Sequence, residues 1–201
     1  TIVIGAYGDD DETGAVYVLR ASDGDELAKL TAADAAPGDQ FGWSVDFAVD
    51  NIVVGANTAG TGGAAYVFRT TDGGASYGQV AKLTASDAAA GDNFGISVAI
   101  DGDTLVVGAW GDDDGGSSSG SAYVFRTTDG GATYAQVAKL TASDAAANDN
   151  FGISVAIDGN TVVVGAYQYN SGGGSGVAYV LRTTDGGATY GQVAKLTASD
   201  A

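Results

Sequence analysis

Three motifs occur in the same order four times along the 201 residues, and this repetition constrains the fold more than any other feature. Each copy has an apolar run ending in Gly-Ala, then an alternating run ending in Arg, then Ala-Lys-Leu-Thr-Ala. Long repeats of this kind are typical of propellers and other arrays, in which each unit buries its apolar face against its neighbours. The repeats run from end to end without a linker, so we expect one domain divided at about 1–40, 41–93, 94–150 and 151–201.

The third repeat shows the expected strands most clearly. Its first two strands are Ile96–Ile100 and Thr104–Ala109, and the Asp-Gly between them is a strong signal for a two-residue type I′ hairpin. Residues 121–126 alternate as a half-buried strand should, and residues 136–141 complete the unit. Four antiparallel strands joined by short turns form one propeller blade. The sequence therefore predicts an all-β fold, a β-propeller of four-stranded antiparallel blades, whose only candidate for a helical turn is Ala142–Ala147.

The first repeat lacks the strand that begins with Phe-Gly in the other three, at Phe41, Phe94 and Phe151. The sequence also stops where a further Phe-Gly strand is due. An open arc of blades leaves strand edges unpaired, which proteins normally avoid. We therefore expect the missing strands to come from more chain or from another subunit, with these repeats forming part of a larger propeller or of an assembly.

Charge and composition exclude several classes of partner and site. The formal net charge is −17, which argues against nucleic acid and against anionic membrane surfaces, because both attract clusters of Lys and Arg. The chain has no Cys, and therefore no disulfide framework or thiol nucleophile. It has no His, which removes the commonest general base and the commonest zinc ligand. No apolar run is long enough to insert into a membrane.

The repeated motifs resemble the FG-GAP repeats of integrin α-subunit propellers and of many microbial surface proteins. The matching pieces are Phe94-Gly95-Ile-Ser-Val-Ala, Val106–Ala109 and Ala122–Phe125, with equivalents in the other copies. The resemblance covers the whole chain. It implies a β-propeller, most often seven-bladed in that family, displayed outside the cell or on its surface and used for adhesion or ligand contact.

The sequence departs from this family in two respects. The proline of the family's Gly-Ala-Pro is replaced by Tyr7, Asn57, Trp110 and Tyr167. The long Asp-x-Asp-x-Asp-Gly loop of calcium-binding members is also cut short, as in Asp101-Gly102-Asp103. A calcium ion takes six to eight oxygen ligands, which so short a turn cannot supply. We therefore do not carry the family's calcium site over to these turns.

A second resemblance lies within the first. Three segments resemble the Asp-box of sialidase-type propellers, a fold-supporting turn between the third and fourth strands of a blade: Thr70–Tyr77, Thr127–Tyr134 and Thr183–Tyr190. They occupy the same place here, which supports the blade interpretation and says little about chemistry.

All eight basic residues fall at repeat positions: Arg20, Arg69, Arg126 and Arg182 end third strands, and Lys29, Lys82, Lys139 and Lys195 lie in fourth strands. A sialidase-like arginine cluster or a phosphate clamp would need basic residues outside these positions. We expect the basic residues to neutralise nearby turn aspartates such as Asp129.

The loops that follow Gly-Ala differ between copies, as binding loops on a rigid scaffold do. Exposed aromatic side chains in these loops can stack on sugar rings or anchor a protein partner, whereas the alternative role is packing against the neighbouring blade. Trp43 is expected to fill the space between blades. The candidate ligand-binding residues are Tyr7, Asn57, Trp110, Tyr167 and Tyr169.

Two of the same loops carry runs of carboxylates, and such runs can hold Ca²⁺ with help from backbone carbonyls. The alternative is a solvated acidic loop that keeps the protein soluble. Ca²⁺ is thus the one cofactor that the sequence brings into consideration. The candidate metal ligands are Asp9, Asp10, Asp11, Asp112, Asp113 and Asp114.

A further aspartate recurs two residues before each Phe-Gly, at Asp39, Asp92 and Asp149. We expect these carboxylates to cap backbone N–H groups at the turn into the next blade. Paired carboxylates can hydrolyse glycosides, but no pair stands apart from the repeated aspartates, so we assign no catalytic residue.

We therefore expect a non-enzymatic, extracellular or cell-surface propeller module with a structural or adhesive role. It would contact protein or glycan through the loops between second and third strands. Two alternatives stay open: a calcium-dependent lectin or assembly module, and a propeller that acts as a carbohydrate-active enzyme.

Overall fold

The computed structural model describes residues 1–167 and 176–198, which form four antiparallel sheets. The first sheet has three strands, β1 (Ile2–Ala6), β2 (Ala15–Leu19) and β3 (Glu26–Leu30). Each of the other three has four strands, hydrogen-bonded in sequence order: β4 (Ser44–Ala48), β5 (Asn51–Ala56), β6 (Ala64–Arg69) and β7 (Gly78–Leu83); β8 (Ser97–Asp101), β9 (Thr104–Ala109), β10 (Ser121–Arg126) and β11 (Ala135–Leu140); β12 (Ser154–Asp158), β13 (Thr161–Ala166), β14 (Val177–Arg182) and β15 (Gly191–Thr197).

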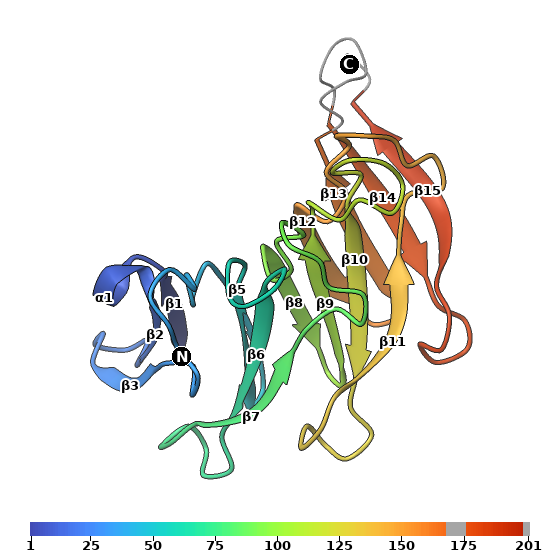
Figure 1. Ribbon diagram of the computed structural model, residues 1–201. Helices are drawn as coiled ribbons and strands as arrows, with labels where there is room; N and C mark the ends of the chain where they lie inside the picture. Colours follow the sequence, from blue (N-terminus) through green and yellow to red (C-terminus); the bar gives the residue numbers. More distant parts are fainter. Residues whose placement is uncertain (168–175, 199–201) are drawn as a thin grey trace.

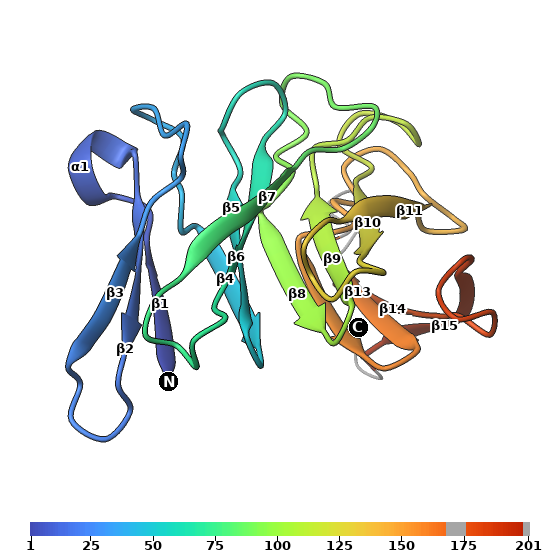
Figure 2. The ribbon, with the colours of Figure 1, turned by 90° about the horizontal axis from the view of Figure 1, so that it is seen from below.

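The four sheets, here called blades 1 to 4, stand side by side in sequence order and form an arc from β1–β3 to β12–β15 (Figures 1 and 2). The innermost strands contact one another across the blades, β4 with β8 and β8 with β12. This radial arrangement of four-stranded meanders is that of a β-propeller. The predicted fold class is confirmed, including the absence of the initial strand from blade 1.

The hairpin between the two inner strands of blade 3 differs from the predicted turn type. In blade 3, Asp101 pairs with Thr104, so the two-residue turn is Gly102-Asp103 and not Asp101-Gly102. Gly102 has a φ of 53°, whereas Asp103 is not among the residues with positive φ. A type I′ turn requires positive φ at both central residues, so the type I′ prediction was wrong.

Neighbouring blades enclose a shared hydrophobic core. In blade 2 the side chains of β5 alternate between two such cores, because successive residues of a strand point to opposite faces of its sheet. Ile52 and Val54 pack with residues of blade 1, and Val53 packs with residues of blade 3. This two-sided burial explains why the second strand of each repeat reads as a continuous apolar run.

The phenylalanine of each Phe-Gly pair lies at the centre of one of these cores. Phe94 is fully buried and its ring meets those of Tyr123 and Phe125 edge-on, at centroid distances of 5.5 and 5.9 Å. Phe41 makes the equivalent contacts with Tyr66 and Phe68. The ring therefore joins the third strand of its own blade to the face of the preceding blade.

The glycine of Gly-Ala is required by the next blade. A Cβ atom on Gly108 would lie 1.9 Å from the carbonyl oxygen of Gly152, which belongs to the following Phe-Gly pair. Ser97 Oγ donates a hydrogen bond of 2.8 Å to that same oxygen. The Gly-Ala motif of one blade therefore packs directly against the Phe-Gly motif of the next blade.

Helical structure is minor and lies elsewhere than expected. Ala142–Ala147 forms no helix; Ala145 N–H donates to the Ala142 carbonyl at 3.2 Å in a tight turn. The short α1 (Asp9–Glu12) includes Asp10 and Asp11 with φ of 47° and 58°, which is left-handed backbone. The carboxylate run of the first repeat is thus a left-handed turn between β1 and β2.

Candidate ligand pocket and lysine–carboxylate cluster

A pocket of about 330 Å³ opens where the inner ends of blades 2, 3 and 4 converge. Its lining comes from three repeat positions: the residue after Gly-Ala, the residue after Phe-Gly, and the residue before Phe. These residues are Asn57, Trp110 and Tyr167; Trp43, Ile96 and Ile153; and Asn93 and Asn150. Because the same positions recur in each blade, their side chains gather at the same end of the arc.

Three of the five predicted ligand-binding residues meet in this pocket, Asn57, Trp110 and Tyr167. Tyr7 does not line it, but its ring packs on that of Trp43 with centroids 4.7 Å apart. Tyr169 lies outside the described residues.

The prediction for the Trp43 side chain was wrong. We expected its ring to fill the space between blades, but it is 40% exposed and forms a wall of the pocket. The residue after Phe-Gly points to the centre of the arc, so Trp43 takes the position that Ile96 and Ile153 have in the next blades. A tryptophan where the other copies carry isoleucine was the signal available in the sequence.

The polar groups of the pocket are amides. Asn57 is 7% exposed, and its Oδ1 atom is buried and without a hydrogen-bond partner among the described residues. Its Nδ2 atom donates to Asn93 Oδ1 at 3.4 Å. Asn93 and Asn150 have φ of 57° and 55°, a left-handed conformation that asparagine tolerates better than most residues. The pocket therefore combines aromatic walls with side-chain amides, one of which has a buried oxygen without a hydrogen-bond partner among the described residues.

The carboxylate run of the third repeat takes part in a different site. Lys139 Nζ of β11 lies 2.7 Å from Asp87, 2.8 Å from Asp112 and 2.6 Å from Asp114. These are the three carboxylates in the described part of the chain whose oxygens lie close enough together to hold one metal ion. The ammonium group is thus already within ion-pair distance of all three. We call these four residues the lysine–carboxylate cluster.

Asp112 is the buried member of the lysine–carboxylate cluster. Its carboxylate accepts hydrogen bonds from Ser121 Oγ at 3.0 Å and from Tyr123 Oη at 2.8 Å. Burial raises the pKa of Asp112, but the hydrogen bonds from Lys139 and Tyr123 outweigh burial and hold that pKa below its usual value. Burial lowers the pKa of Lys139, and its hydrogen bonds to the three aspartates reverse this and raise the pKa. The carboxylate and the ammonium therefore stabilise each other's charge.

The other lysines show how the cluster arises. Lys82 and Lys195 each pair with an aspartate of the segment before their blade, Asp34 at 2.5 Å and Asp144 at 2.6 Å. Lys29 pairs instead with Asp9 of its own blade, at 2.7 Å. Lys139 has both kinds of partner, because Asp87 corresponds to Asp34, and Asp112 to Asp9.

The remaining predicted metal ligands lie apart from this cluster. Asp113 accepts a hydrogen bond from Ser118 N–H at 2.6 Å. Asp10 and Asp11 are part of the left-handed turn α1, where their backbone carbonyls accept from Thr13 and Gly38. In the first repeat the hydrogen bond from Lys29 holds the pKa of Asp9 below its usual value.

The Asp-box segments are self-contained turns. Asp129 accepts hydrogen bonds from Thr127 Oγ1 at 2.7 Å, Thr133 Oγ1 at 2.6 Å and the backbone N–H of Thr133 at 2.9 Å. The bonds from Thr133 and Thr127 hold the pKa of Asp129 well below its usual value. Asp129 has no ion pair within the described structure. Our expectation that a basic residue neutralises it was wrong, and Arg126 donates instead to the Gly186 carbonyl of the next blade.

The aspartates before Phe-Gly cap backbone N–H groups as predicted. Asp39, Asp92 and Asp149 accept from the backbone N–H of the residue three positions earlier, at 2.9, 2.7 and 2.9 Å. Burial raises the pKa of Asp92, which is 4% exposed. The capping bond accounts for the burial of this carboxylate.

The comparisons with known proteins bear on the fold and the family. A family model for the FG-GAP repeat matches residues 25–68, 77–125 and 134–181, more than half of the chain. The crystal structure of the Saccharomyces cerevisiae Sqt1 is similar at a TM-score of 0.55 and 12% identity, over 96% of this chain and 47% of that one. The chain thus spans about half of that structure, and the likeness concerns the fold alone. No curated protein sequence matches, and no helix of the described residues is long and apolar enough to cross a membrane. The chain belongs to the FG-GAP repeat family.

Proposed function

We propose that the protein is a non-enzymatic interaction module, displayed outside the cell or on its surface, which binds a protein partner through the pocket between blades 2, 3 and 4. An FG-GAP repeat propeller suggests a protein-interaction module in general. The observation that supports this particular site is the gathering of Trp43, Trp110 and Tyr167 around one opening. Trp and Tyr are the residues that most often dominate protein–protein binding energy.

The chemistry of the pocket supports a partner with particular groups. The partner presents an apolar or aromatic side chain to the tryptophans and polar groups to the amide side chains of Asn57, Asn93 and Asn150. With a formal charge of −17 on the chain, basic residues around that anchor accelerate the encounter and orient it.

A neutral sugar is the second candidate ligand, and one observation favours it. The residues that line the pocket are aromatic, aliphatic or amide, and none of them is charged. An aromatic face with neighbouring amides suits a ring whose edges carry hydroxyl groups.

The carboxylates support a non-enzymatic role. Asp112 and Asp114 are bound to Lys139, Asp129 is held by its own turn, and Asp92 caps a backbone N–H. A glycosidase needs one carboxylic acid and one free carboxylate facing a shared substrate space. Each of these four groups already has a structural partner.

The two tryptophans provide the test, because both line the pocket and any ligand that enters should change their fluorescence. Peptides selected from a displayed library, and a set of neutral oligosaccharides, would be titrated into wild type, Trp110→Ala and Val137→Ala. Val137 lies on β11, 38% exposed and outside the pocket. We expect Trp110→Ala to weaken binding at least tenfold and Val137→Ala to leave it unchanged.

The same titration separates the candidates. Binding of peptides that carry an aromatic residue beside basic ones supports the protein partner, whereas binding of oligosaccharides alone assigns the pocket to glycans. A ligand bound equally well by Trp110→Ala, with an unchanged melting temperature, would place the function elsewhere on the molecule.

A further inference from the structure

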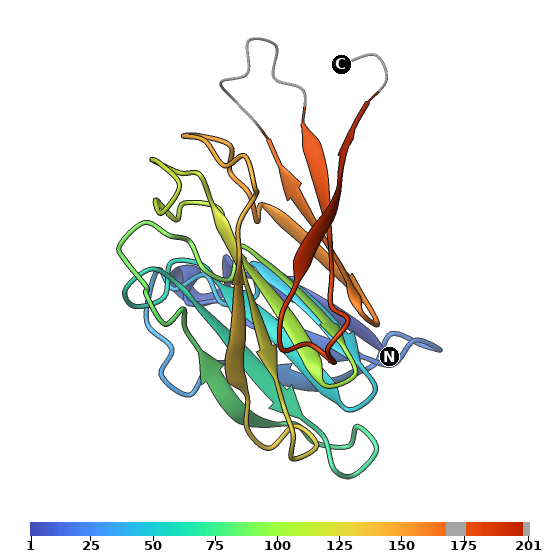
Figure 3. The same ribbon diagram turned by 90° about the vertical axis from the view of Figure 1, so that its right-hand side faces the viewer.

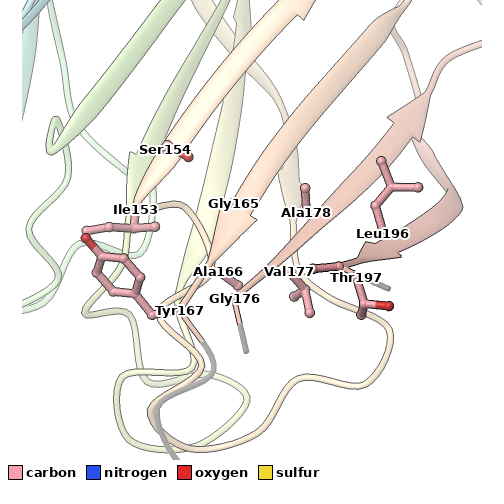
Figure 4. A pocket seen from close by; sticks show the side chains of 11 residues that line it. Ile153, Ser154, Gly165, Ala166, Tyr167, Gly176, Val177, Ala178, Leu196 and Thr197 are labelled. Atoms are coloured by element: carbon pink, nitrogen blue, oxygen red, sulfur yellow. The ribbon is translucent and has the colours of Figure 1, made fainter. Parts of the chain in front are cut away.

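A second pocket, of about 420 Å³, opens on the face of blade 4 that points away from blade 3. In Figure 3 this blade is the nearest of the four, with no described strand in front of it. The lining residues come from the ends of its strands (Figure 4), among them Ser154, Gly165, Val177 and Leu196. The pocket is independent of the ligand pocket apart from Ile153 and Tyr167, which line both.

The same position is filled in the other three blades. On blade 2, the Phe94-Gly95 pair covers Gly55 and Ala64, and Phe94 forms a parallel bridge with Gly63. Ser44 Oγ donates to the Gly95 carbonyl at 2.8 Å. On blade 3, Phe151-Gly152 makes the equivalent bridge with Gly120 and accepts the hydrogen bond from Ser97. On blade 1, Phe41 bridges to Gly14.

The residues of blade 4 match these positions one for one. Gly165 corresponds to Gly55, Ser154 to Ser44, and Leu196 to Leu83. The leucine shows the difference in burial: Leu30, Leu83 and Leu140 are 4%, 4% and 3% exposed, whereas Leu196 is 53% exposed. Among the described residues, the pocket is therefore an unfilled copy of a position, here called the seat, that a Phe-Gly pair fills on each of the other three blades.

The geometry points to the pocket of blade 4 as a docking site for an extended segment that begins with Asp-x-Phe-Gly, as a further FG-GAP repeat does. The filled seat on blade 2, where Phe94 packs with Ala65 and Leu83, supplies the rule for the occupant. A phenylalanine lies over the equivalent pair Ala178 and Leu196, and the glycine after it has a carbonyl that accepts from Ser154 Oγ. This interaction surface differs from the ligand pocket and does not depend on it.

The occupant needs glycine after phenylalanine for a steric reason. Gly95 has a φ of 92°, and a Cβ there would lie 2.3 Å from the carbonyl oxygen of Ala64. On the receiving side, a Cβ on Gly55 would lie 1.9 Å from the Gly95 carbonyl oxygen. Both contacts are to backbone atoms, which cannot move aside. Alanine at either position should therefore abolish docking.

Gly165 offers a variant that closes the seat without disturbing the fold. A Cβ there would meet Ser154 Oγ, the end of a side chain that can rotate, and no backbone atom within 3.4 Å. Gly191 on β15 of the same blade is the matched control, because a Cβ there meets nothing within 4 Å. Neither glycine has a positive φ, so alanine is allowed at both.

The experiment uses a fluorescently labelled peptide with the sequence of residues 146–157, which contains Phe151-Gly152, and measures its anisotropy with the whole chain. We expect saturable binding at one peptide per chain. Binding should weaken at least tenfold for peptides with Phe151→Ala or Gly152→Ala and for the protein variant Gly165→Ala, while Gly191→Ala should bind like wild type. Melting temperatures of both protein variants within a degree or two of wild type would show that the fold is intact.

Three outcomes would overturn the proposal. The first is no binding of the parent peptide at millimolar concentration, and the second is equal binding by Gly165→Ala. The third is self-association of the chain, in analytical ultracentrifugation, that Gly165→Ala abolishes and the peptide does not displace, because it would assign the seat to a second copy through a different contact.

Discussion

Lys139 of β11 places its ammonium nitrogen 2.8 Å from the carboxylate of Asp112, whose side chain is only 5% exposed. Asp112 is one of the residues that the sequence suggested as calcium ligands. A buried carboxylate is stable when a charged partner and hydrogen bonds compensate it, and here Lys139, Tyr123 and Ser121 do so together. The Lys139 ammonium group thus occupies the place where the sequence suggested a calcium ion.

Replacing Lys139 by Ala should destabilise the fold. The change leaves the Asp112 charge buried without its cation, which costs roughly 2–4 kcal/mol in the free energy of unfolding. Urea denaturation measures this loss. Lys82→Ala is the matched control at the same repeat position, and because the Lys82–Asp34 pair is half-exposed, its loss should cost about 1 kcal/mol or less. Equal costs for the two variants would contradict a special role of Asp112.

Calcium should leave the melting temperature of the wild-type protein unchanged. A ligand that binds only the folded state stabilises it, but an ion entering among Asp87, Asp112 and Asp114 would have to displace the Lys139 ammonium. In Lys139→Ala the three carboxylates lack that cation, so millimolar Ca²⁺ should raise the lowered melting temperature. Scanning calorimetry in Ca²⁺ and in EDTA measures both. A rise in the wild type would instead support the calcium-dependent alternative.

Replacing Gly108 by Ala should destabilise the chain by about 1–3 kcal/mol or more, because the added Cβ would lie 1.9 Å from the Gly152 carbonyl oxygen and force blades 3 and 4 apart. Gly78→Ala on the outer strand β7 is the control, since a Cβ there meets nothing within 4 Å. Thermal unfolding of the two variants tests the claim. A harmless Gly108→Ala would mean that the contact between blades is looser than described.

Acid should destabilise the protein through the Asp-box turns. Hydrogen bonds lower the pKa of Asp72, Asp129 and Asp185 in the folded state. A lowered folded pKa contributes stability above the unfolded value of about 3.9, and that stability is lost as the pH falls through the folded pKa. The free energy of unfolding should therefore decline below about pH 4. Asp129→Asn should weaken this pH dependence, and Asp158→Asn, at an exposed strand end, should not.

The strands and their grouping into blades could be predicted because the information is local. Thr104–Ala109 and Ser121–Arg126 were predicted with the observed bounds, since apolar runs between glycine-rich turns favour strands whatever surrounds them. The two residues that form the turn were harder to predict. Gly102-Asp103 replaced the predicted Asp101-Gly102 because pairing of Asp101 with Thr104 extends the ladder by one residue.

The candidate sites were predictable only in part. The disagreement between repeats correctly drew attention to Asn57, Trp110 and Tyr167, but no local signal showed that they share one pocket with Trp43. In the same way, the acidic run at Asp112 was visible in the sequence. Its contact with Lys139, which lies in the outermost strand of the blade, was not.

The sequence by itself determined the repeating unit: its period of two within strands, its glycine turns and its four copies specify blades wherever they fold. The tertiary structure decided which side chains meet. Trp43 and Trp110 come together because consecutive blades turn equivalent positions to one centre, and Lys139 meets Asp87 because one blade packs on the segment that precedes it. Such contacts depend on the angle and spacing between blades, which are set by how Phe-Gly fits onto Gly-Ala and not by any local preference of the chain.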